Sequence, residues 1–317
     1  MSNNLSVISQ PIFLVGAERS GTTLLRLMLD GHPNIAFQSE FEFVVDYFQG
    51  DNYPSLDDYY EYLTTDRIFQ SDNWVIDRTL DYPQLVNSFL VQKRENTGKY
   101  FVGATVHRHF DRLLKIWSDA KFIHLVRDGR DVARSCMNMN WAGNVWTGSE
   151  RWIEVEQLWS HLKANLDCDQ YIEVHYETLI AQPKQILRDI SHFIGTNYDP
   201  LMLSYAQTTT YDLPDSQLLG QWKRKLSARE IRLLEAKIGS MLLEYDYELS
   251  QLPPLSVNQM RDRILKLHSK LAVILGRINI YGLPLIFSSV LSRHLKLKQW
   301  QKQIQLQCNN IDTARLK

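Results

Sequence analysis

A glycine-flanked turn near the N-terminus has the residue types of a phosphate-binding loop. Gly16 and Gly21 flank this turn, the short apolar run Ile12–Val15 precedes it, and a helical pattern begins near Thr22. At such a strand-to-helix turn, backbone N–H groups and the helix N-terminus converge on a phosphate. Thr22 occupies the place of the lysine that reaches the β- and γ-phosphates in triphosphate-binding loops. The loop therefore suits a nucleotide with one 5′ phosphoryl-type group better than a triphosphate.

A second strand-to-helix unit carries arginines toward the same place. The run Phe122–Val126 is predicted to be a buried strand, Arg127 follows it, and a helix is predicted from Asp131 onward. Ligands of doubly wound sheets bind at the carboxyl ends of the strands, so we expect Arg127 to lie near the loop. The alternative is that Arg127, Arg130 and Arg134 form a solvated basic face.

Two carboxylates and two histidines have the chemistry to transfer protons. Glu40 and Glu42 follow the first predicted helix, and His107 and His109 belong to Tyr100–Phe110, a predicted strand that ends in a basic loop. Two histidines spaced by two on a strand share one face. The alternatives are solvated glutamates, because most Glu side chains are exposed, and histidines that are only hydrogen-bonded polar residues.

A further basic cluster lies at Trp222–Lys225, just before Ser227–Glu230. The second segment has the pattern of a helix capping box. A cationic loop at a helix start either holds a second phosphate or lies at the surface, and both interpretations of Lys223 and Arg224 are open.

The remaining segments supply the elements that position these residues. A strand is predicted over Gln170–Tyr176, and a helix with an apolar stripe is predicted to begin at Pro183 and end at Gly195. Residues 51–99 are predicted to be a helical insertion near the site. Because strands and helices alternate, the sequence predicts an α/β fold with a parallel sheet covered by helices on both faces.

Composition favours a single α/β domain with an extension. The chain has 317 residues, 44% of them hydrophobic, and a net charge of −1. Residues 255–317 contain eleven Lys and Arg against two acidic residues, a net of +9, which leaves −10 for residues 1–254. The scattered Cys136, Cys168 and Cys308 indicate neither a disulfide framework nor a zinc site. The first residues lack a signal-peptide pattern, so we expect a cytoplasmic protein.

Residues 255–317 are predicted to form basic amphipathic helices. Apolar residues recur there at alternating steps of three and four, as in a helical seam, and a second apolar helix is predicted after Pro284. We expect these helices to pack on residues 1–254 or on the second subunit of a homodimer. The alternative is a surface that binds anionic membrane, which would make the protein peripheral, or an acidic acceptor. Polar residues and Pro284 interrupt the apolar stretch, so no transmembrane helix is predicted. The seam consists of Val257, Met260, Ile264, Leu267, Leu271, Ile274 and Ile278.

Together, these residues resemble the sulfotransferases that use 3′-phosphoadenosine 5′-phosphosulfate (PAPS). The likeness runs from Pro11 to Tyr245: Arg19–Thr23 resembles the family's 5′-phosphosulfate loop, and Phe122–Ser135 resembles its 3′-phosphate motif. Arg19 stands where the phenol and steroid enzymes have lysine, so the sequence is more similar to tyrosylprotein and bacterial carbohydrate or small-molecule sulfotransferases. The resemblance implies a P-loop-like sulfotransferase fold, with a catalytic domain of residues 1–254 and an extension of residues 255–317.

The resemblance also implies roles for individual residues. Glu40 lies twenty-one residues beyond Arg19 and would be the general base. Arg19 and His107 are the further catalytic candidates. The residues implied to bind PAPS are Arg19, Ser20, Gly21, Thr22 and Thr23 at the 5′ end, Arg127 and Ser135 at the 3′-phosphate, Tyr176 near the adenine, and Lys223 with Arg224. No metal is implied.

Two departures from the family pattern bear on acceptor and mechanism. Glu42 replaces an arginine that the tyrosylprotein enzymes use for acidic peptides, which disfavours a protein-tyrosine acceptor. The lysine that neutralises the leaving oxygen is absent, and Arg19, His107, Arg108 or His109 would replace it. A small-molecule, carbohydrate or lipid hydroxyl or amine is the expected acceptor, with no nucleic acid partner. A P-loop kinase and a non-catalytic nucleotide-binding domain remain the alternatives.

Overall fold

A parallel five-stranded sheet forms the centre of the protein. The computed structural model describes residues 7–48, 50 and 52–316. Each pair of neighbouring strands is parallel, in the order β2-β3-β1-β4-β5, so the predicted α/β class is confirmed. The strands are β1 (Ile12–Val15), β2 (Ile35–Glu40), β3 (Phe101–Val106), β4 (Lys121–Val126) and β5 (Tyr171–His175).

Strand β2 is a strand that the sequence analysis did not indicate. It pairs with β3, and its first residues, Ile35, Ala36 and Phe37, are fully buried. The pairing register shifts between Gln38 and Glu40, where the strand ends. This edge strand brings Glu40 to the carboxyl end of the sheet, beside the end of β3.

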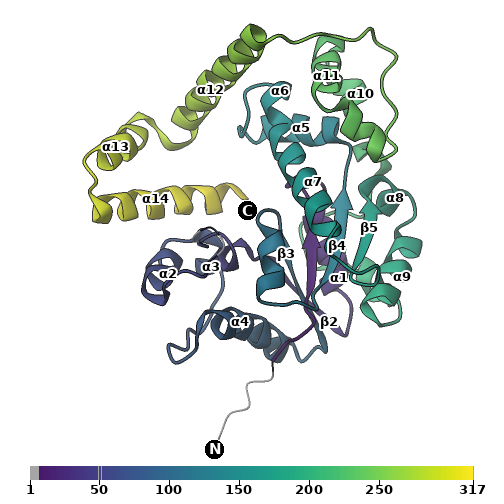
Figure 1. Cartoon of the computed structure of the whole chain (residues 1–317), viewed down its shortest axis with the longest axis vertical. Coiled ribbons are helices and arrows are strands. Elements are labelled where there is room, and N and C mark those ends of the chain that lie inside the picture. The colour runs from purple at the N-terminus through teal and green to yellow at the C-terminus, as the bar shows by residue number, and fades with distance from the viewer. Residues whose placement is uncertain (1–6, 49, 51, 317) are drawn as a thin grey trace, which may run out of the picture.

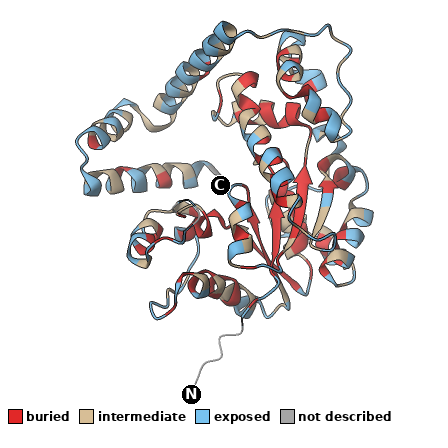
Figure 2. Ribbon diagram, viewed as in Figure 1, coloured by how far each residue is buried: buried red, intermediate tan, exposed pale blue. Residues whose placement is uncertain are grey.

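Helices cover both faces of the sheet, as Figures 1 and 2 show. One face packs against α1 (Thr22–Asp30), α8 (Tyr176–Ala181) and α9 (Pro183–Ile194). The other face packs against α4 (Tyr82–Thr97), α5 (Gly129–Asn138), α7 (Glu150–Lys163) and α11 (Ala228–Glu244). Burial on two sides explains why the central strands are almost entirely apolar.

Local signals define several helix ends where the sequence predicted them. Ser227 and Glu230 make both hydrogen bonds of a capping box at the start of α11, and Gly195 ends α9 at φ 103°. Helices occupy most of the predicted insertion, over its described residues 52–99. The shorter helices are α2 (Leu56–Leu63), α3 (Arg67–Gln70), α6 (Val145–Gly148) and α10 (Trp222–Lys225), with 3₁₀ turns η1 (Glu42–Val44), η2 (Phe110–Lys115), η3 (Pro200–Leu203), η4 (Tyr205–Gln207) and η5 (Ser216–Leu218).

The C-terminal residues form an arm of three helices, α12 (Gln259–Tyr281), α13 (Leu283–His294) and α14 (Lys298–Leu316). In Figure 1, α12 leads away from α11, α13 turns, and α14 runs back toward the sheet. No single described helix is long and apolar enough to cross a bilayer. Taken together, α12 and α13 have sufficient length and apolar character, but the pair is bent by 113°.

Most of the apolar seam predicted for residues 257–278 is exposed, although Val257 at its start packs against the core. Met260, Ile264 and Leu267 along it are exposed, whereas the buried residue of α12 is Ser269, on the opposite side. The predicted packing of these helices on residues 1–254 does occur for α12, which bonds to Gly143, Asn144 and Trp146, but the exposed part of the seam does not take part in it. Helical periodicity identified the apolar face, but α12 attaches through its polar face instead.

Candidate functional site

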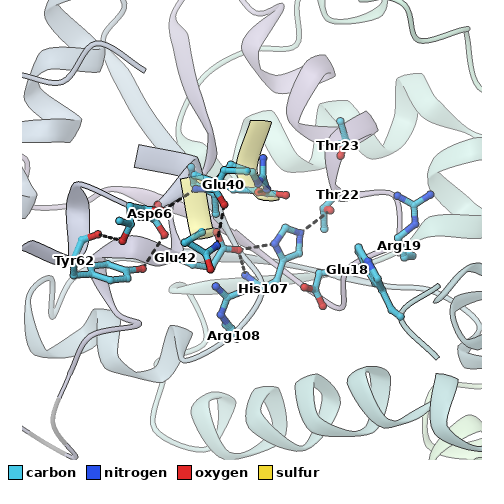
Figure 3. Close-up of a pocket in the computed structure, with 16 residues that line it drawn as sticks. Glu18, Arg19, Thr22, Thr23, Glu40, Glu42, Tyr62, Asp66, His107 and Arg108 are labelled. Carbon is cyan, nitrogen blue, oxygen red and sulfur yellow. Dashed lines mark hydrogen bonds and ion pairs between the residues drawn. The ribbon is translucent and has the colours of Figure 1, made fainter. Parts of the chain in front are cut away.

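Two cavities meet at the loop between β1 and α1. The Glu40 cavity, of about 530 Å³, is shown in Figure 3, and the Arg127 cavity has about 580 Å³. Arg19, Thr22 and Thr23 line both of them. A molecule in one cavity can therefore meet a molecule in the other beside these three residues.

The loop is shaped by close approaches that only glycine permits. Gly21 has φ 95°, and a Cβ there would lie 2.4 Å from the ring of Tyr176. A Cβ on Gly16 would lie 2.4 Å from the carbonyl oxygen of Leu125 on β4. Gly21 is also the N-cap of α1 and, having no side chain, makes no cap hydrogen bond. The N-terminus of α1 thus faces the shared region as an anion-binding end.

The Arg127 cavity brings together the residues expected to bind the nucleotide. Arg19 Nε donates to Ser135 Oγ over 2.9 Å, and Arg127 Nη1 donates to the Arg19 carbonyl over 3.2 Å. The Arg127 guanidinium lies 4.3 Å from the centre of the Tyr176 ring. Arg19 from the loop, Arg127 from the end of β4 and the aromatic ring of Tyr176 therefore all line one cavity.

Two buried polar atoms at this edge lack a protein partner. Ser20 Oγ and Arg127 Nε are buried and make no hydrogen bond within the described residues. Burial of an unpaired polar atom is costly, so a hydroxyl and a guanidinium N–H left in this state fit an anionic ligand. The donor set, two arginines with hydroxyls and a helix N-terminus, suits phosphate or sulfonate oxygens.

Arg130 does not belong to a solvated face. It is buried, its guanidinium donates to Asp128 and Glu235, and it lies 3.7 Å from the Trp222 ring centre. Arg134 does line the Arg127 cavity, where its Nη1 donates to Gln221 Oε1 over 2.5 Å. The alternative interpretation of these arginines as one solvated surface is therefore wrong for Arg130, which has a structural role.

Lys223 and Arg224 lie just outside the cavity lining. Gln221, immediately before α10, lines the Arg127 cavity in their place. The Lys223 ammonium lies 5.4 Å from the Trp222 ring centre, and Arg224 Nη2 donates to the carbonyl oxygen of Gln217. Ser20, which is buried, is likewise outside the lining, and the expected nucleotide residues that do line the cavity are Arg19, Gly21, Thr22, Thr23, Arg127, Ser135 and Tyr176.

Glu40 lines the other cavity from the end of β2. Its carboxylate accepts a hydrogen bond from Arg67 Nη2 over 3.2 Å and is 45% exposed. Burial raises the pKa of Glu40, and the charge of Glu42 adds to this shift, whereas His107 and Arg67 oppose it. A carboxylate with a raised pKa at the cavity wall has the properties of a general base.

Glu42 and His107 form a buried chain that ends on the loop. Glu42 Oε1 accepts from the His107 backbone N–H over 2.9 Å and lies 2.6 Å from His107 Nδ1. His107 Nε2 lies 3.0 Å from Thr22 Oγ1, as Figure 3 shows. Glu42 is buried, so the interpretation of both glutamates as solvated charges is wrong for Glu42.

The charges of this pair support each other. Burial alone would lower the pKa of His107, but the hydrogen bond and charge of Glu42 raise it above its ordinary value. Burial alone would raise the pKa of Glu42, but the same interaction lowers it. An imidazolium and a carboxylate are therefore favoured, with the positive ring against Thr22.

The neighbours of His107 are positioned differently from the sequence-based expectation. Strand β3 ends at Val106, and His109 has φ 53° and is exposed, so the two histidines do not share a strand face. Arg108 lines the Glu40 cavity but is paired with Asp46 over 2.5 Å. His107 is thus the histidine that reaches the loop.

Several lining residues come from segments that motif reasoning did not single out. Asp66 and Arg67, around the start of α3, line the Glu40 cavity, as do Gln305 and Asn309 from α14. Asn309 Nδ2 donates to the Thr65 carbonyl over 2.9 Å. No local signal marks these positions; only the predicted helical insertion pointed to the first of these segments.

Comparison with known proteins identifies the family. A model of the sulfotransferase family matches residues 11–200. A putative protein-tyrosine sulfotransferase of Caenorhabditis briggsae is 26% identical over 214 residues, covering 63% of this chain and 71% of that protein. Protein-tyrosine sulfotransferase 1 of Danio rerio is 25% identical over 209 residues, covering 62% of this chain and 56% of that protein.

Two solved structures share the fold. The sulfotransferase domain from the curacin biosynthetic pathway has a TM-score of 0.57 at 18% identity, covering 77% of this chain and 100% of that chain. The sulfotransferase domain of the Synechococcus PCC 7002 olefin synthase has a TM-score of 0.51 at 20% identity, covering 77% and 98%. The family model matches more than half of the sequence, from the strand before the loop through α9, and this chain therefore belongs to the sulfotransferase family of enzymes.

Proposed function

We propose that the protein transfers a sulfuryl group from PAPS to a hydroxyl or amine of a polar acceptor. The observation that carries this proposal is the pair of cavities that share Arg19, Thr22 and Thr23. The Arg127 cavity takes the nucleotide, and the Glu40 cavity takes the acceptor. In-line transfer requires the acceptor and the leaving group on opposite sides of the sulfur, and two cavities meeting at one loop supply that arrangement.

The nucleotide is held at its two ends by separate elements. Arg19 and the backbone from Ser20 to Thr23 bind the 5′ phosphosulfate, and Arg127 with Ser135 binds the 3′-phosphate. Tyr176 lies against the adenine side. The unpaired Arg127 Nε supports this assignment, because Arg127 lines the cavity and its Nε–H gains an anionic partner when the nucleotide binds.

Glu40 acts as the general base in this scheme. As the acceptor oxygen or nitrogen attacks sulfur, Glu40 takes its proton, and the sulfur–oxygen bond to the 5′-phosphate breaks. The raised pKa of Glu40 supports the role because proton affinity nearer to neutrality makes a better base. Proton transfer of this kind contributes roughly 10²–10⁴-fold in rate.

His107 compensates for the absent leaving-group lysine. Held in the imidazolium form by Glu42, it donates to Thr22 Oγ1 and places positive charge beside the loop. The bond that breaks leaves negative charge on the 5′-phosphate oxygen, and His107 with Arg19 neutralises it. Preorganised charge of this kind is the usual dominant source of transition-state stabilisation.

The lining of the Glu40 cavity favours a polar acceptor. Charged and hydrogen-bonding side chains predominate, and the aliphatic and indole contributors are Ile68 and Trp141. A carbohydrate, a polar small molecule or a lipid headgroup fits this lining better than a flat apolar phenol. The carboxylates of this lining are matched in number by cationic groups, so it lacks the excess of positive charge that an acidic tyrosine peptide would need.

A transfer assay with labelled PAPS tests the proposal. The protein is incubated with a panel of hydroxyl and amine acceptors, and mass spectrometry identifies the sulfated product. Glu40→Gln should lower turnover on the order of 10²–10⁴-fold while binding adenosine 3′,5′-bisphosphate normally in calorimetry. Full activity of Glu40→Gln would remove Glu40 from its role, and magnesium-dependent ATP turnover without sulfate transfer would contradict the function itself.

A further inference from the structure

The outer face of α12 presents an apolar stripe to solvent. Met260, Ile264, Leu267 and Leu271 are separated by steps of four, three and four, which places them on one side of the helix. All four are exposed, and Met260 reaches 73%. Figure 2 shows α12 exposed over most of its length.

The inner face of α12 is fixed to the body by polar contacts. Trp146 Nε1 donates to Asp262 Oδ1 over 2.8 Å, and the Gly143 N–H donates to Ser269 Oγ over 2.8 Å. Asn144 Nδ2 donates to the Leu265 carbonyl over 2.7 Å. These hydrogen bonds fix the rotation of α12 about its own axis. The apolar stripe therefore faces solvent because the helix is held in that orientation.

Helix α13 continues the apolar surface. Leu283, Phe287 and Val290 are separated by four and three residues and are exposed, with Phe287 at 68%. Gly282, at φ 78°, lies at the break between the two helices. Seven large apolar side chains exposed on two consecutive helices exceed the single exposed side chains that are normal on a soluble protein.

A basic stripe runs beside the apolar one. Arg263, Lys266, Lys270 and Arg277 follow each other at steps of three, four and seven, so they share a neighbouring side of α12. Lys266 pairs with Asp262 on its own helix, and Arg263, Lys270 and Arg277 are exposed. Residues 255–317 carry a net charge of +9.

The positive charge of this surface favours an anionic membrane over a second copy of the chain as its partner. Pairing of two copies through α12 brings like charges together, and Asp262 and Asp312, the acidic residues of 255–317, are each bonded within their own chain. An anionic bilayer offers hydrocarbon to the apolar stripe and phosphate to the basic one.

We propose that the outer faces of α12 and α13 dock the protein on anionic membrane, lying in the plane of the lipid headgroups. The bend of 113° between the helices and the arginines along α12 suit a surface-lying pair. The docking is independent of sulfuryl transfer, because none of its residues lines the Arg127 or the Glu40 cavity.

Vesicle co-sedimentation of the full chain tests the proposal. Phosphatidylcholine vesicles with and without phosphatidylglycerol are compared for three proteins: wild type, Leu267→Asp/Phe287→Asp, and Arg263→Glu/Lys270→Glu. Two matched controls make the same chemical changes at exposed positions within residues 1–254. They are Val75→Asp/Leu201→Asp and Lys184→Glu/Arg188→Glu. Circular dichroism and thermal unfolding verify that each variant is folded.

Wild type should pellet with anionic vesicles, and high salt should release it because the attraction is partly electrostatic. Each arm variant should lower the partition coefficient on the order of tenfold or more, and the controls should leave it unchanged. Three results would overturn the proposal: no binding of wild type to anionic vesicles, equal binding by folded arm variants, or binding that high salt does not reverse. A stable dimer that Leu267→Asp/Phe287→Asp dissociates, without vesicle binding, would assign the surface to a second copy.

Discussion

Arg127 contacts three parts of the site at once. Its guanidinium donates to the carbonyls of Arg19 and Leu218 and lies over Tyr176, and its Nε has no partner. These contacts hold the group in place, and the Nε–H is one of the N–H groups that they leave for a ligand. A charged donor held this way binds a phosphate with little loss of side-chain entropy.

We expect Arg127→Ala to weaken binding of adenosine 3′,5′-bisphosphate by about 1.5–3 kcal/mol, the range for hydrogen bonds to charged groups. Calorimetric titration of the folded variant measures this change. Arg229→Ala is the matched control, because Arg229 is an exposed residue of α11 outside the cavity lining and should leave affinity nearly unchanged. Unchanged affinity of Arg127→Ala would reject the 3′-phosphate assignment.

The Glu42–His107 pair leads to a prediction about how enzymatic activity depends on pH. Activity should rise as Glu40 loses its proton and fall as the pH rises through the raised pKa of His107. In Glu42→Gln, burial dominates and the pKa of His107 drops, so the alkaline limb of the kcat profile should move to lower pH. An unmoved alkaline limb would show that the charge of His107 is not needed for turnover.

At the scale of elements, α14 connects the C-terminal arm to the catalytic residues. Its Asn309 is bonded to the carbonyl of Thr65, just before α3, and Gln305 donates to Asn309 Oδ1 over 2.9 Å. Both amides line the cavity that contains Glu40. The proposed boundary after residue 254 therefore separates two parts of the sequence, but α14 returns to the acceptor side of the site.

Gln305→Ala should raise the KM for the acceptor several-fold and leave the KM for PAPS unchanged. The reason is that Gln305 lines the Glu40 cavity and is absent from the Arg127 cavity. Steady-state kinetics with one saturating substrate at a time separates the two constants. Gln303→Ala, at an exposed position on the same helix, is the control. Equal changes in both constants would indicate a general structural effect.

At the scale of the whole molecule, a second buried histidine links the sheet to its helical cover. His124 on β4 lies 3.0 Å from a carboxylate oxygen of Glu156 on α7 and stacks on Trp159, with ring centres 4.5 Å apart. Burial alone would lower the pKa of His124, but the negative charges of Glu156 and of Glu173 on β5 raise it. The ionised ring therefore contributes to folding stability.

The raised pKa of His124 determines in which direction the free energy of unfolding changes with pH. The contribution of protonated His124 is fully present below its unfolded pKa, near 6.5, and is lost as the pH rises through the higher folded value. The free energy of unfolding should therefore decline as the pH rises above about 6.5 and through the raised folded pKa, with His107 contributing in the same direction. Urea denaturation across this pH range measures it. His124→Gln should flatten the dependence, and an unchanged slope would contradict the assignment.

The sequence determined the elements whose signals are local. Strand β1, the glycine loop and α1 follow from a short apolar run, two glycines and helical spacing, and the Ser227 capping box marks α11 in the same way. Arg127 could be placed near the loop because strand ends of a parallel sheet meet at one edge. Backbone preferences and near-neighbour hydrogen bonds act over a few residues, so one segment carries enough information.

The tertiary structure decided which distant residues meet. Only the fold joins Glu42 to His107 and Thr22, and only it brings Asn309 of α14 to the Glu40 cavity. The seam of α12 shows what the sequence alone cannot predict. Its helical periodicity predicts an apolar face, but it does not predict which surface that face contacts. Which surfaces cover each other depends on the balance of packing and polar contacts over the whole chain, and no segment contains that balance by itself.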